Sequence, residues 1–406
     1  MNGKGMGVLH AVTDSLSTVL LRGQASYLRA KGFDPALLCG PGAGTEQIRD
    51  REAAAVFTVA MRREISPAYD LKSLFQVWRL LLRIQPVICN SGTPKAGLIV
   101  GIAAWLARVP CRIYTLRGLR LETATGIKRS ILFLTERVSC FCAHRVICVS
   151  PSLRGRAIKL GVLPGDKAVL LGAGSSNGVD TNRFASTPQK MSQAAELRQK
   201  LGIRQDQPVI GFAGRFTRDK GLPELVAAFQ SVRKEVPETV LLLVGSYEKG
   251  DPVPQKTRDA IESEPGVICV EFTSQIELYY LVMNIFALPT HREGFPNTVL
   301  EAHAAGRPVV TTVATGAVDS VHHGVTGLLV PVGNSERLAE ALLSLLFDPA
   351  KASALGQAGK ERVLREFRNE AIWQALASLY REMLHERGYV FPSVERAEAV
   401  KCTQTQ

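Results

Sequence analysis

The fold of this chain is decided by the stretch Pro289-Thr-His-Arg-Glu293-Gly-Phe-Pro-Asn-Thr-Val-Leu-Glu301-Ala-His-Ala-Ala-Gly306-Arg-Pro-Val-Val310. The apolar run Ile285–Leu288 before it predicts a buried strand, and residues 290–296 predict the loop that leaves its carboxyl end. A helix is predicted from about Asn297 to Ala305, because Gly306 is a typical left-handed stop before a proline.

Two carboxylates flank this helix start. Glu293 lies on the loop, and Glu301 lies about one turn into the helix. Between them the first backbone N–H groups have no partner inside the helix, which makes an anion site. A carboxylate, a row of N–H donors and a second carboxylate suit, in that order, a sugar hydroxyl, a diphosphate and a ribose. The predicted donor-binding residues of this segment are Gly294, Phe295, Pro296, Asn297, Thr298 and Glu301.

The segment resembles the signature of family 4 retaining glycosyltransferases with the GT-B fold, in which two glutamates separated by seven residues lie in a Glu-Gly-Phe-Pro…Glu-Ala…Gly-x-Pro-Val-Val frame. The resemblance implies that Glu293 contacts hydroxyls of the donor sugar and that Glu301 contacts the ribose of the nucleotide. A second pattern, Tyr114-Thr-Leu-Arg117-Gly118, resembles bacterial capsule, O-antigen and exopolysaccharide glycosyltransferases. His291 and His303 are assigned no role, since a lone histidine beside a motif is usually a surface or packing residue.

A second motif is Gly211-Phe-Ala-Gly214-Arg215-Phe-Thr-Arg-Asp-Lys220-Gly221. Gly211 and Gly214 let the backbone approach a ligand at a strand end, and two cations follow beside the next helix start. The motif is similar to the family element whose Arg and Lys neutralise the leaving diphosphate, so Arg215, Lys220 and Glu293 are the predicted catalytic residues. The chain has no Asp-x-Asp, so neither a metal ion nor another cofactor is expected.

A nicotinamide-binding fingerprint is the competing interpretation of Val169-Leu-Leu-Gly172-Ala-Gly174. That fingerprint needs a helix that opens at the glycines and an acidic residue about 20 positions later. The following segment, residues 175–184, is instead turn-rich and extended, and it resembles the interdomain crossing of GT-B enzymes. An oxidoreductase is therefore disfavoured.

Strands alternate with helices along the 406 residues, which exceeds the size of one core and predicts two α/β domains with parallel sheets. With the resemblance, the expected fold is GT-B: two Rossmann-like domains facing a cleft, with C-terminal helices crossing back. The predicted parts are residues 1–174 for the acceptor, 175–366 for the nucleotide sugar, 367–390 as the returning helix, and 391–406 as a disordered tail. The predicted strands are Gly7–Val12, Ala36–Cys39, Val56–Val59, Val87–Cys89, Arg112–Thr115, Arg145–Val149, Val209–Ala213, Val240–Val244, Val267–Val270, Ile285–Leu288, Pro308–Thr311 and Leu328–Val330.

The first domain departs from the family pattern. Where many members have a Gly-Gly pair, this chain has Thr13-Asp-Ser-Leu-Ser17-Thr18, and the predicted donor contacts there are Ser17 and Thr18, at the start of a helix over Leu20–Lys31. Where relatives have a histidine near the reacting centre, this chain has Arg117, which cannot act as a base at pH 7. Arg117 is expected to act electrostatically, and Glu122 is either an acceptor contact or part of a surface salt bridge.

Charge is uneven along the chain. Residues 1–185 carry 25 Lys/Arg against 11 Asp/Glu, a net charge of +14, whereas residues 186–406 carry 24 against 26, a net charge of −2. An anionic partner of the first domain is expected, but no nucleic-acid module is recognisable. The amphipathic segment Ile127–Cys142 fits either an anionic membrane surface or a core-facing helix. Without a leader or an apolar span, the protein is expected in the cytoplasm, peripheral on the inner face of the cell membrane, with reduced cysteines.

The sequence, with the resemblance, thus predicts a metal-independent retaining hexosyltransferase that moves a sugar from a nucleotide sugar, expected to be a UDP-sugar, to a polyprenyl-diphosphate-linked or other saccharide acceptor. A nucleotide-sugar epimerase or a phosphorylase on the same architecture is the alternative, and a basic scaffold without catalysis is a third. The base of the nucleotide, the sugar and the linkage are left open.

Overall fold

The computed structural model describes residues 6–42, 45–62, 64, 66–248 and 250–390. The chain divides into two compact units: Met1–Asn177 with Asn369–Gln406, and Gly178–Arg368. The change of unit after Asn177 is close to the boundary predicted after Gly174, and the change after Arg368 is close to the boundary predicted after Glu366. The tail predicted to be disordered, residues 391–406, lies outside the described residues.

The first unit contains a seven-stranded parallel sheet with the strand order β3-β2-β1-β4-β5-β6-β7. Its strands are β1 (Met6–Ala11), β2 (Phe33–Cys39), β3 (Ala55–Thr58), β4 (Ile88–Ser91), β5 (Cys111–Leu116), β6 (Arg145–Cys148) and β7 (Ala168–Leu170). Its helices are η1 (Leu16–Leu21), α1 (Gln24–Ala30), α2 (Thr45–Glu52), α3 (Pro67–Ile84), α4 (Pro94–Leu106), η2 (Arg120–Glu122), α5 (Gly126–Cys142), α6 (Pro151–Lys159), η3 (Gly165–Lys167) and α16 (Asn369–His385).

The second unit contains a six-stranded parallel sheet with the order β10-β9-β8-β11-β12-β13. Its strands are β8 (Val209–Ala213), β9 (Val240–Val244), β10 (Val267–Val270), β11 (Ile285–Leu288), β12 (Val309–Thr312) and β13 (Gly327–Val330). Its helices are α7 (Thr181–Phe184), α8 (Pro188–Lys200), η4 (Arg218–Lys220), α9 (Leu222–Glu235), α10 (Gln255–Ser263), α11 (Ile276–Val282), α12 (Asn297–Ala304), α13 (Ala317–Ser320), α14 (Ser335–Leu346) and α15 (Pro349–Glu366).

Both sheets reverse their winding direction at an inner strand. β1 pairs with β2 on one side and β4 on the other, and β8 pairs with β9 and β11 in the same way. In open parallel sheets, ligands bind outside the carboxyl ends of the strands at such switch points. The two sequence motifs lie at the switch point of the second unit, because one leaves the carboxyl end of β8 and the other leaves the carboxyl end of β11.

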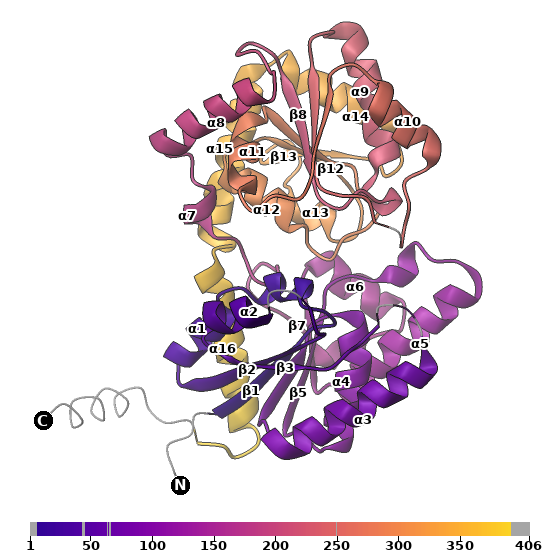
Figure 1. Cartoon of the computed structure of the whole chain (residues 1–406), viewed down its shortest axis with the longest axis vertical. Helices are drawn as coiled ribbons and strands as arrows, with labels where there is room; N and C mark the ends of the chain where they lie inside the picture. Colours follow the sequence, from indigo (N-terminus) through magenta and orange to yellow (C-terminus); the bar gives the residue numbers. More distant parts are fainter. Residues whose placement is uncertain (1–5, 43–44, 63, 65, 249, 391–406) are drawn as a thin grey trace, which may run out of the picture. The chain divides into compact units, whose positions relative to one another are not determined.

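The C-terminal helix α16 belongs to the first unit, where it packs on one face of the sheet (Figure 1). Leu376, Tyr380 and Met383 of α16 share a buried cluster with Val8 of β1. The next residue along β1, Leu9, belongs to a second cluster with residues of α3 and α4. Because successive strand residues point to opposite faces, helices cover both faces of this sheet.

All twelve predicted strands are present, with ends shifted by a few residues at most. The helix predicted over Leu20–Lys31 is wrong as one element. Gly23 has φ 82°, a left-handed value, and separates η1 from α1. A positive φ at that position ends one helical segment before the next can begin.

Two further local expectations are corrected. Ser274 and Glu277 have the spacing of a capping box, which predicts a helix that opens at Ser274. The helix instead begins after Gln275, and the Glu277 carboxylate binds Arg183 at 2.8 Å. Gly211 does not open space for a ligand. A Cβ at Gly211 would lie 2.1 Å from Sδ of Met283, so this glycine serves core packing. Six of the seven described cysteines are buried free thiols, in line with the predicted reduced state.

Candidate active site

The loop between β11 and α12 holds Glu293 in a fixed position. The backbone N–H of Glu293 donates a hydrogen bond to the carbonyl of Thr315 at 2.9 Å. Gly316 follows with φ 77°, and a Cβ at this residue would lie 2.3 Å from the carbonyl oxygen of Gly294. Only glycine allows this close approach of two backbones, so the segment before α13 supports the loop from behind.

The start of α12 presents backbone donors, as the sequence predicts. Within the described residues, the N–H groups of Gly294, Phe295, Asn297 and Thr298 donate no hydrogen bond. Residues 294–296 are buried, while Asn297 is half-buried at the helix start. Unpaired N–H groups at the N-terminus of a helix attract an anion, because the helix dipole adds partial positive charge there.

Lys220 lies beside this loop and pairs with Glu293. Its Nζ donates a hydrogen bond to Oε1 of Glu293, and the two side chains are only 18% and 11% exposed. The approach depends on Gly221, with φ 74°, where a Cβ would lie 2.0 Å from the carbonyl oxygen of Pro289. An ammonium has three donors, so Lys220 can bind both Glu293 and a ligand oxygen.

Arg215 is in a more open place, with its side chain 61% exposed, and forms an ion pair with Glu248. Glu248 lies on the loop after β9, which sequence reasoning did not connect with the site. The two loops are also joined by a backbone bridge between Phe216 and Tyr247. Gly214, just before Arg215, is half-buried and has φ 149°, a value that favours glycine. The chain therefore leaves the strand direction at Gly214.

Glu301 has a partner that the sequence analysis missed. The hydroxyl of Tyr280, on α11, donates to Oε2 of Glu301 at 2.8 Å. Burial raises the pKa of Glu301 to about 7, although the Tyr280 hydrogen bond lowers it. Tyr280 occupies a buried position of a short apolar helix. A buried tyrosine needs a partner for its hydroxyl, and this requirement was the available signal.

Additional ion pairs surround the motif residues. Asp219 binds Arg292, and Glu224 binds Nε2 of His291 at 2.9 Å, which raises the pKa of this histidine. His303, by contrast, is buried against Gly359, and burial lowers its pKa to about 3. His303 is therefore a packing residue, whereas His291 helps to fix the loop through Glu224.

In the first unit, Ser17 and Thr18 make local contacts. The hydroxyl of Thr18 donates to the carbonyl of Ser15 at 2.6 Å, and the backbone N–H of Ser17 donates to the Asp14 carboxylate at 2.8 Å. The helical segment here is the short η1, Leu16–Leu21, in place of the single helix predicted over Leu20–Lys31. A donor contact by the two hydroxyls stays a prediction.

The other two predicted residues of the first unit follow β5. Arg117 donates a hydrogen bond through Nη1 to the carbonyl of Gly92. Glu122, in η2, accepts a hydrogen bond from Nε of Arg156 at 3.0 Å. The salt-bridge interpretation of Glu122 is thus confirmed, and its contact with an acceptor stays a prediction.

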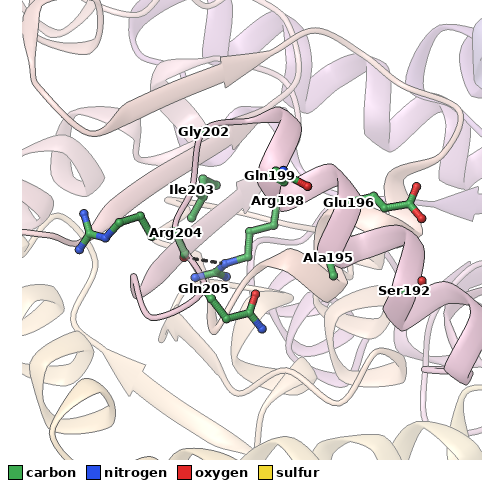
Figure 2. A pocket seen from close by; sticks show the side chains of 9 residues that line it. All are labelled: Ser192, Ala195, Glu196, Arg198, Gln199, Gly202, Ile203, Arg204 and Gln205. Carbon is green, nitrogen blue, oxygen red and sulfur yellow. Dashed lines mark hydrogen bonds between the residues drawn. The ribbon is translucent and has the colours of Figure 1, made fainter.

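A shallow hollow in the second unit lies apart from these residues. Figure 2 shows it between the end of α8 and the following turn, within residues 192–205. Its central side chain, Arg198, donates through Nε to the carbonyl of Arg204 at 3.0 Å and through Nη1 to the carbonyl of Val282 at 3.2 Å. Carbonyl contacts of this kind hold the chain turn together, and the hollow contains none of the predicted site residues.

Comparison with known proteins identifies the family of this chain. Residues 193–362 match the family described as glycosyl transferases group 1, and residues 17–174 match the glycosyl transferase 4-like domain. CapM of Staphylococcus aureus, a capsular polysaccharide biosynthesis glycosyltransferase, is 38% identical over 383 residues, or 94% of this chain and 99% of CapM. The chain belongs to this glycosyltransferase family.

Other glycosyltransferases are similar over most of the chain. A UDP-Gal:alpha-D-GlcNAc-diphosphoundecaprenol alpha-1,3-galactosyltransferase of Escherichia coli is 25% identical over 78% of this chain and 81% of its own. Anabaena HepE, solved with UDP and glucose, has a TM-score of 0.78 at 20% identity and covers 93% of this chain and 100% of its own. WaaG, solved as a lipopolysaccharide glycosyltransferase, has a TM-score of 0.70 at 15% identity, covering 92% and 99%. At such identities the likeness of the two solved structures shows the fold alone: two Rossmann-like domains of the GT-B class.

No group of three or more His, Cys, Asp or Glu side chains that could hold a metal ion occurs in the described part of this glycosyltransferase. Its independence of metal ions stays a prediction. Lys220 and Arg292 are cations at the α12 loop, where they pair with Glu293 and Asp219, and Arg215 pairs with Glu248 on the loop after β9.

Proposed function

We propose that this glycosyltransferase moves a sugar from a UDP-sugar to a lipid-linked saccharide, with retention of configuration, during the synthesis of a surface polysaccharide. The similarity to CapM supports the polysaccharide role. The name of the E. coli relative specifies a UDP-sugar donor and a diphosphoundecaprenol-linked acceptor, which supports both substrate classes. The complexes of HepE with UDP further support a UDP-sugar donor.

One observation carries the donor assignment: Lys220 pairs with Glu293 directly beside the unpaired N–H groups of the α12 start. A diphosphate placed against these N–H groups meets the ammonium of Lys220 on one side. The sugar attached to it then lies within reach of the Glu293 carboxylate, which accepts hydrogen bonds from hydroxyls. Glu301, further along the same helix, is the acceptor for the ribose hydroxyls.

The proposed reaction proceeds on one face of the sugar. The bond between the anomeric carbon and the phosphate oxygen breaks while the acceptor hydroxyl oxygen bonds to the same carbon, and the hydroxyl proton passes to the departing diphosphate. Negative charge therefore grows on the diphosphate in the transition state. In this proposal, Arg215, Lys220 and the N–H groups of Gly294, Phe295 and Asn297 stabilise that charge, which is the kind of interaction that raises the rate.

We further propose that no metal ion is needed, because the two cations and the helix start together supply the positive charge that a divalent ion supplies elsewhere. Glycosyl transfer at an unchanged rate in excess EDTA supports this, and restoration by Mg²⁺ or Mn²⁺ after loss in EDTA contradicts it.

The first unit has a surface suited to an anionic membrane. Three neighbouring helices, α3, α4 and α5, have exposed apolar side chains. On α5, Ile127, Leu134 and Phe141 are 81%, 61% and 66% exposed and lie on one face at helical spacing, with the exposed Lys128 and Arg137 on either side of it. Leu71, Phe75 and Leu82 form a similar exposed stripe on α3, and Trp105 and Leu106 are exposed on α4. No helix of the described residues is long and apolar enough to span a bilayer, so the proposal is binding at the surface.

The function is tested by mass spectrometry of the purified protein with a panel of nucleotide sugars, each offered with and without polyprenyl-diphosphate-linked saccharides. The proposal requires a UDP-sugar-dependent mass increase of the lipid-linked acceptor. Conversion of the donor without any acceptor supports the epimerase alternative. Binding of a nucleotide sugar without turnover under all conditions contradicts an enzymatic role.

A further inference from the structure

Arg117 is a charged side chain of the first unit whose charge is not balanced by the protein. It follows the last residue of β5, and its Nη1 donates to the carbonyl of Gly92. The fit is close, because a Cβ at Gly92 would lie 2.0 Å from Nη1. Its Nε is buried and has no hydrogen-bond partner among the described side chains and backbone groups. The guanidinium is thus held in place by one contact and retains unused donors.

The groups around Arg117 are neutral. In the described part of the chain, Arg117 forms no ion pair with a carboxylate. His10, on β1, is buried, and both its burial and the charge of Arg117 lower its pKa to about 4, so it is neutral at pH 7. Burial of an unbalanced charge is costly and usually calls for a counter-ion or a ligand.

A hydrogen-bonded network keeps these neutral groups in position. Asn90 donates to the hydroxyl of Tyr380 at 2.8 Å, and Thr115 donates to Oδ1 of Asn90 at 2.8 Å. The Tyr380 hydroxyl also lies 3.0 Å from Nε2 of His10. The network contains no carboxylate, and its members Asn90 and Thr115 line the same cavity as Arg117, so it does not neutralise the guanidinium.

The position of Arg117 in the fold is that of a ligand site. Arg117, Gly92 and Thr115 line, with Gln24 and Ser176, a cavity of about 10 Å³, which has room for one water molecule. A phosphate therefore lies over this cavity and not inside it, against the half-buried Arg117. The cavity lies at the carboxyl ends of β4 and β5, beside the switch point between β1 and β4, where ligands bind in open parallel sheets. The second unit has its own cations and helix start for the nucleotide diphosphate, so a second anion site in the first unit is available to the other substrate.

We infer that Arg117 anchors a phosphate group of the sugar acceptor. The inference rests on the proposed function and specifies its acceptor as a phosphate-bearing lipid, with the phosphate adjacent to the saccharide end. The guanidinium provides two parallel N–H donors for phosphate oxygens, which suits this ligand better than an uncharged sugar. The nucleotide is the other possible source of the phosphate, and the experiment separates the two.

The test compares Arg117→Gln and Arg117→Lys with a matched control, Arg112→Gln. Arg112 lies on the same strand, β5, but donates to the carbonyls of Cys142 and Val109 at 2.7 and 3.0 Å, which is a structural role. Binding of farnesyl diphosphate, inorganic pyrophosphate and UDP is measured by calorimetry, and the melting temperature is measured without ligand.

The expected result for Arg117→Gln is at least tenfold weaker binding of farnesyl diphosphate, with unchanged UDP binding and a melting temperature equal to or above that of the parent. Arg117→Lys should recover part of the farnesyl diphosphate affinity. Arg112→Gln should lower the melting temperature and leave farnesyl diphosphate binding within twofold of the parent.

Three outcomes overturn the inference. The first is binding of farnesyl diphosphate to Arg117→Gln as tight as to the parent. The second is loss of UDP binding in Arg117→Gln, which assigns the phosphate to the nucleotide. The third is a lower melting temperature of Arg117→Gln, as in the control, with no change in binding. Failure of the proposed function is a different result, since the parent would then neither bind UDP nor transfer sugar, whatever the response of Arg117 to prenyl diphosphates.

Discussion

The Tyr280 hydroxyl donates a hydrogen bond of 2.8 Å to Oε2 of Glu301, and this bond links two helices of the second unit, α11 and α12. Glu301 is the residue expected to receive the ribose hydroxyls. Because burial raises its pKa to about 7, its charge changes within the range in which such an enzyme is assayed. Tyr280 therefore influences the proposed nucleotide site through the charge of its neighbour.

The affinity for UDP should rise with pH through this range. Glu301 is mostly protonated below about pH 7 and ionised above it, and an ionised carboxylate accepts a stronger hydrogen bond from ribose. The phosphate of UDP also loses a proton near pH 6, so calorimetry at pH 6, 7 and 8 must compare the parent with Glu301→Gln. The parent should gain affinity more steeply than the variant. Parallel curves would exclude a role for Glu301 ionisation.

Tyr280→Phe should shift the pH dependence of UDP binding to higher pH. The Tyr280 hydrogen bond lowers the pKa of Glu301, so its loss leaves more of the carboxyl protonated at pH 7 and weakens UDP binding there. The stability of the protein without UDP has the opposite pH dependence, since it falls as the pH rises. A carboxyl whose pKa is raised on folding favours the folded state at low pH, and this contribution is lost as the pH rises through about 7.

Arg215→Ala and Lys220→Ala should each slow sugar transfer by about 2–4 kcal/mol of transition-state stabilisation, as is typical for loss of one contact to a developing anion. Donor affinity should fall less. The matched control is Arg218→Ala, because Arg218 belongs to the same turn but pairs with Asp251 at 3.6 Å and is 61% exposed. Single-turnover rates near the parent value in either Arg215→Ala or Lys220→Ala, with the fold intact, would remove the diphosphate assignment.

Glu248→Gln should strengthen UDP binding. In the unliganded structure Glu248 forms an ion pair with Arg215, and a diphosphate must compete with it. An exposed pair of this kind contributes about 0–1 kcal/mol, so the gain in affinity should be at most about fivefold. Asp251→Asn on the same loop serves as the control. Weaker UDP binding in Glu248→Gln would show that Glu248 holds Arg215 in its binding position instead.

The regular elements and the motif residues could be predicted from sequence because each depends on neighbouring residues. The apolar runs predicted twelve strands of the two sheets but not β7, which has only three residues, and Gly306, with φ 73°, ends the helix that begins at Asn297. Long-range partners could not be predicted in the same way. Glu248 meets Arg215 only because β8 and β9 are adjacent, and Tyr280 meets Glu301 only through helix packing.

Errors occurred where a local pattern had two physical explanations. A glycine at position 211 can serve either to let a ligand approach the backbone or to leave space for a core side chain. Only the position of Met283 decides between these two explanations. Ser274 and Glu277 have the spacing of a capping box, but Arg183 binds the Ser274 carbonyl and the Glu277 carboxylate. A charged hydrogen bond of this kind is stronger than a neutral cap.

The surface formed by α3, α4 and α5 makes a prediction for membrane binding. The protein should sediment with vesicles that contain anionic lipid and be released by salt, because screening shortens charge attraction to about 10 Å at 0.1 M. Each Lys or Arg near the surface contributes about 1 kcal/mol. Changing Lys128, Arg129 and Arg137 together to Glu should therefore abolish sedimentation and leave UDP binding unchanged, since all three are exposed on the first unit.

Two further variants separate charge from apolar contact. Lys234, Lys256 and Lys351 are exposed on the second unit, and their joint change to Glu makes the same change in net charge on helices outside the proposed surface, so sedimentation should persist. Ile127, Leu134 and Phe141 changed to Ser should weaken sedimentation at every salt concentration, because their burial in the interface does not depend on screening. Equal loss in the charge-matched control would mean that total charge, and not the α3–α5 surface, governs binding. Equal sedimentation of the parent with neutral and anionic vesicles would exclude the basic residues as the membrane contact.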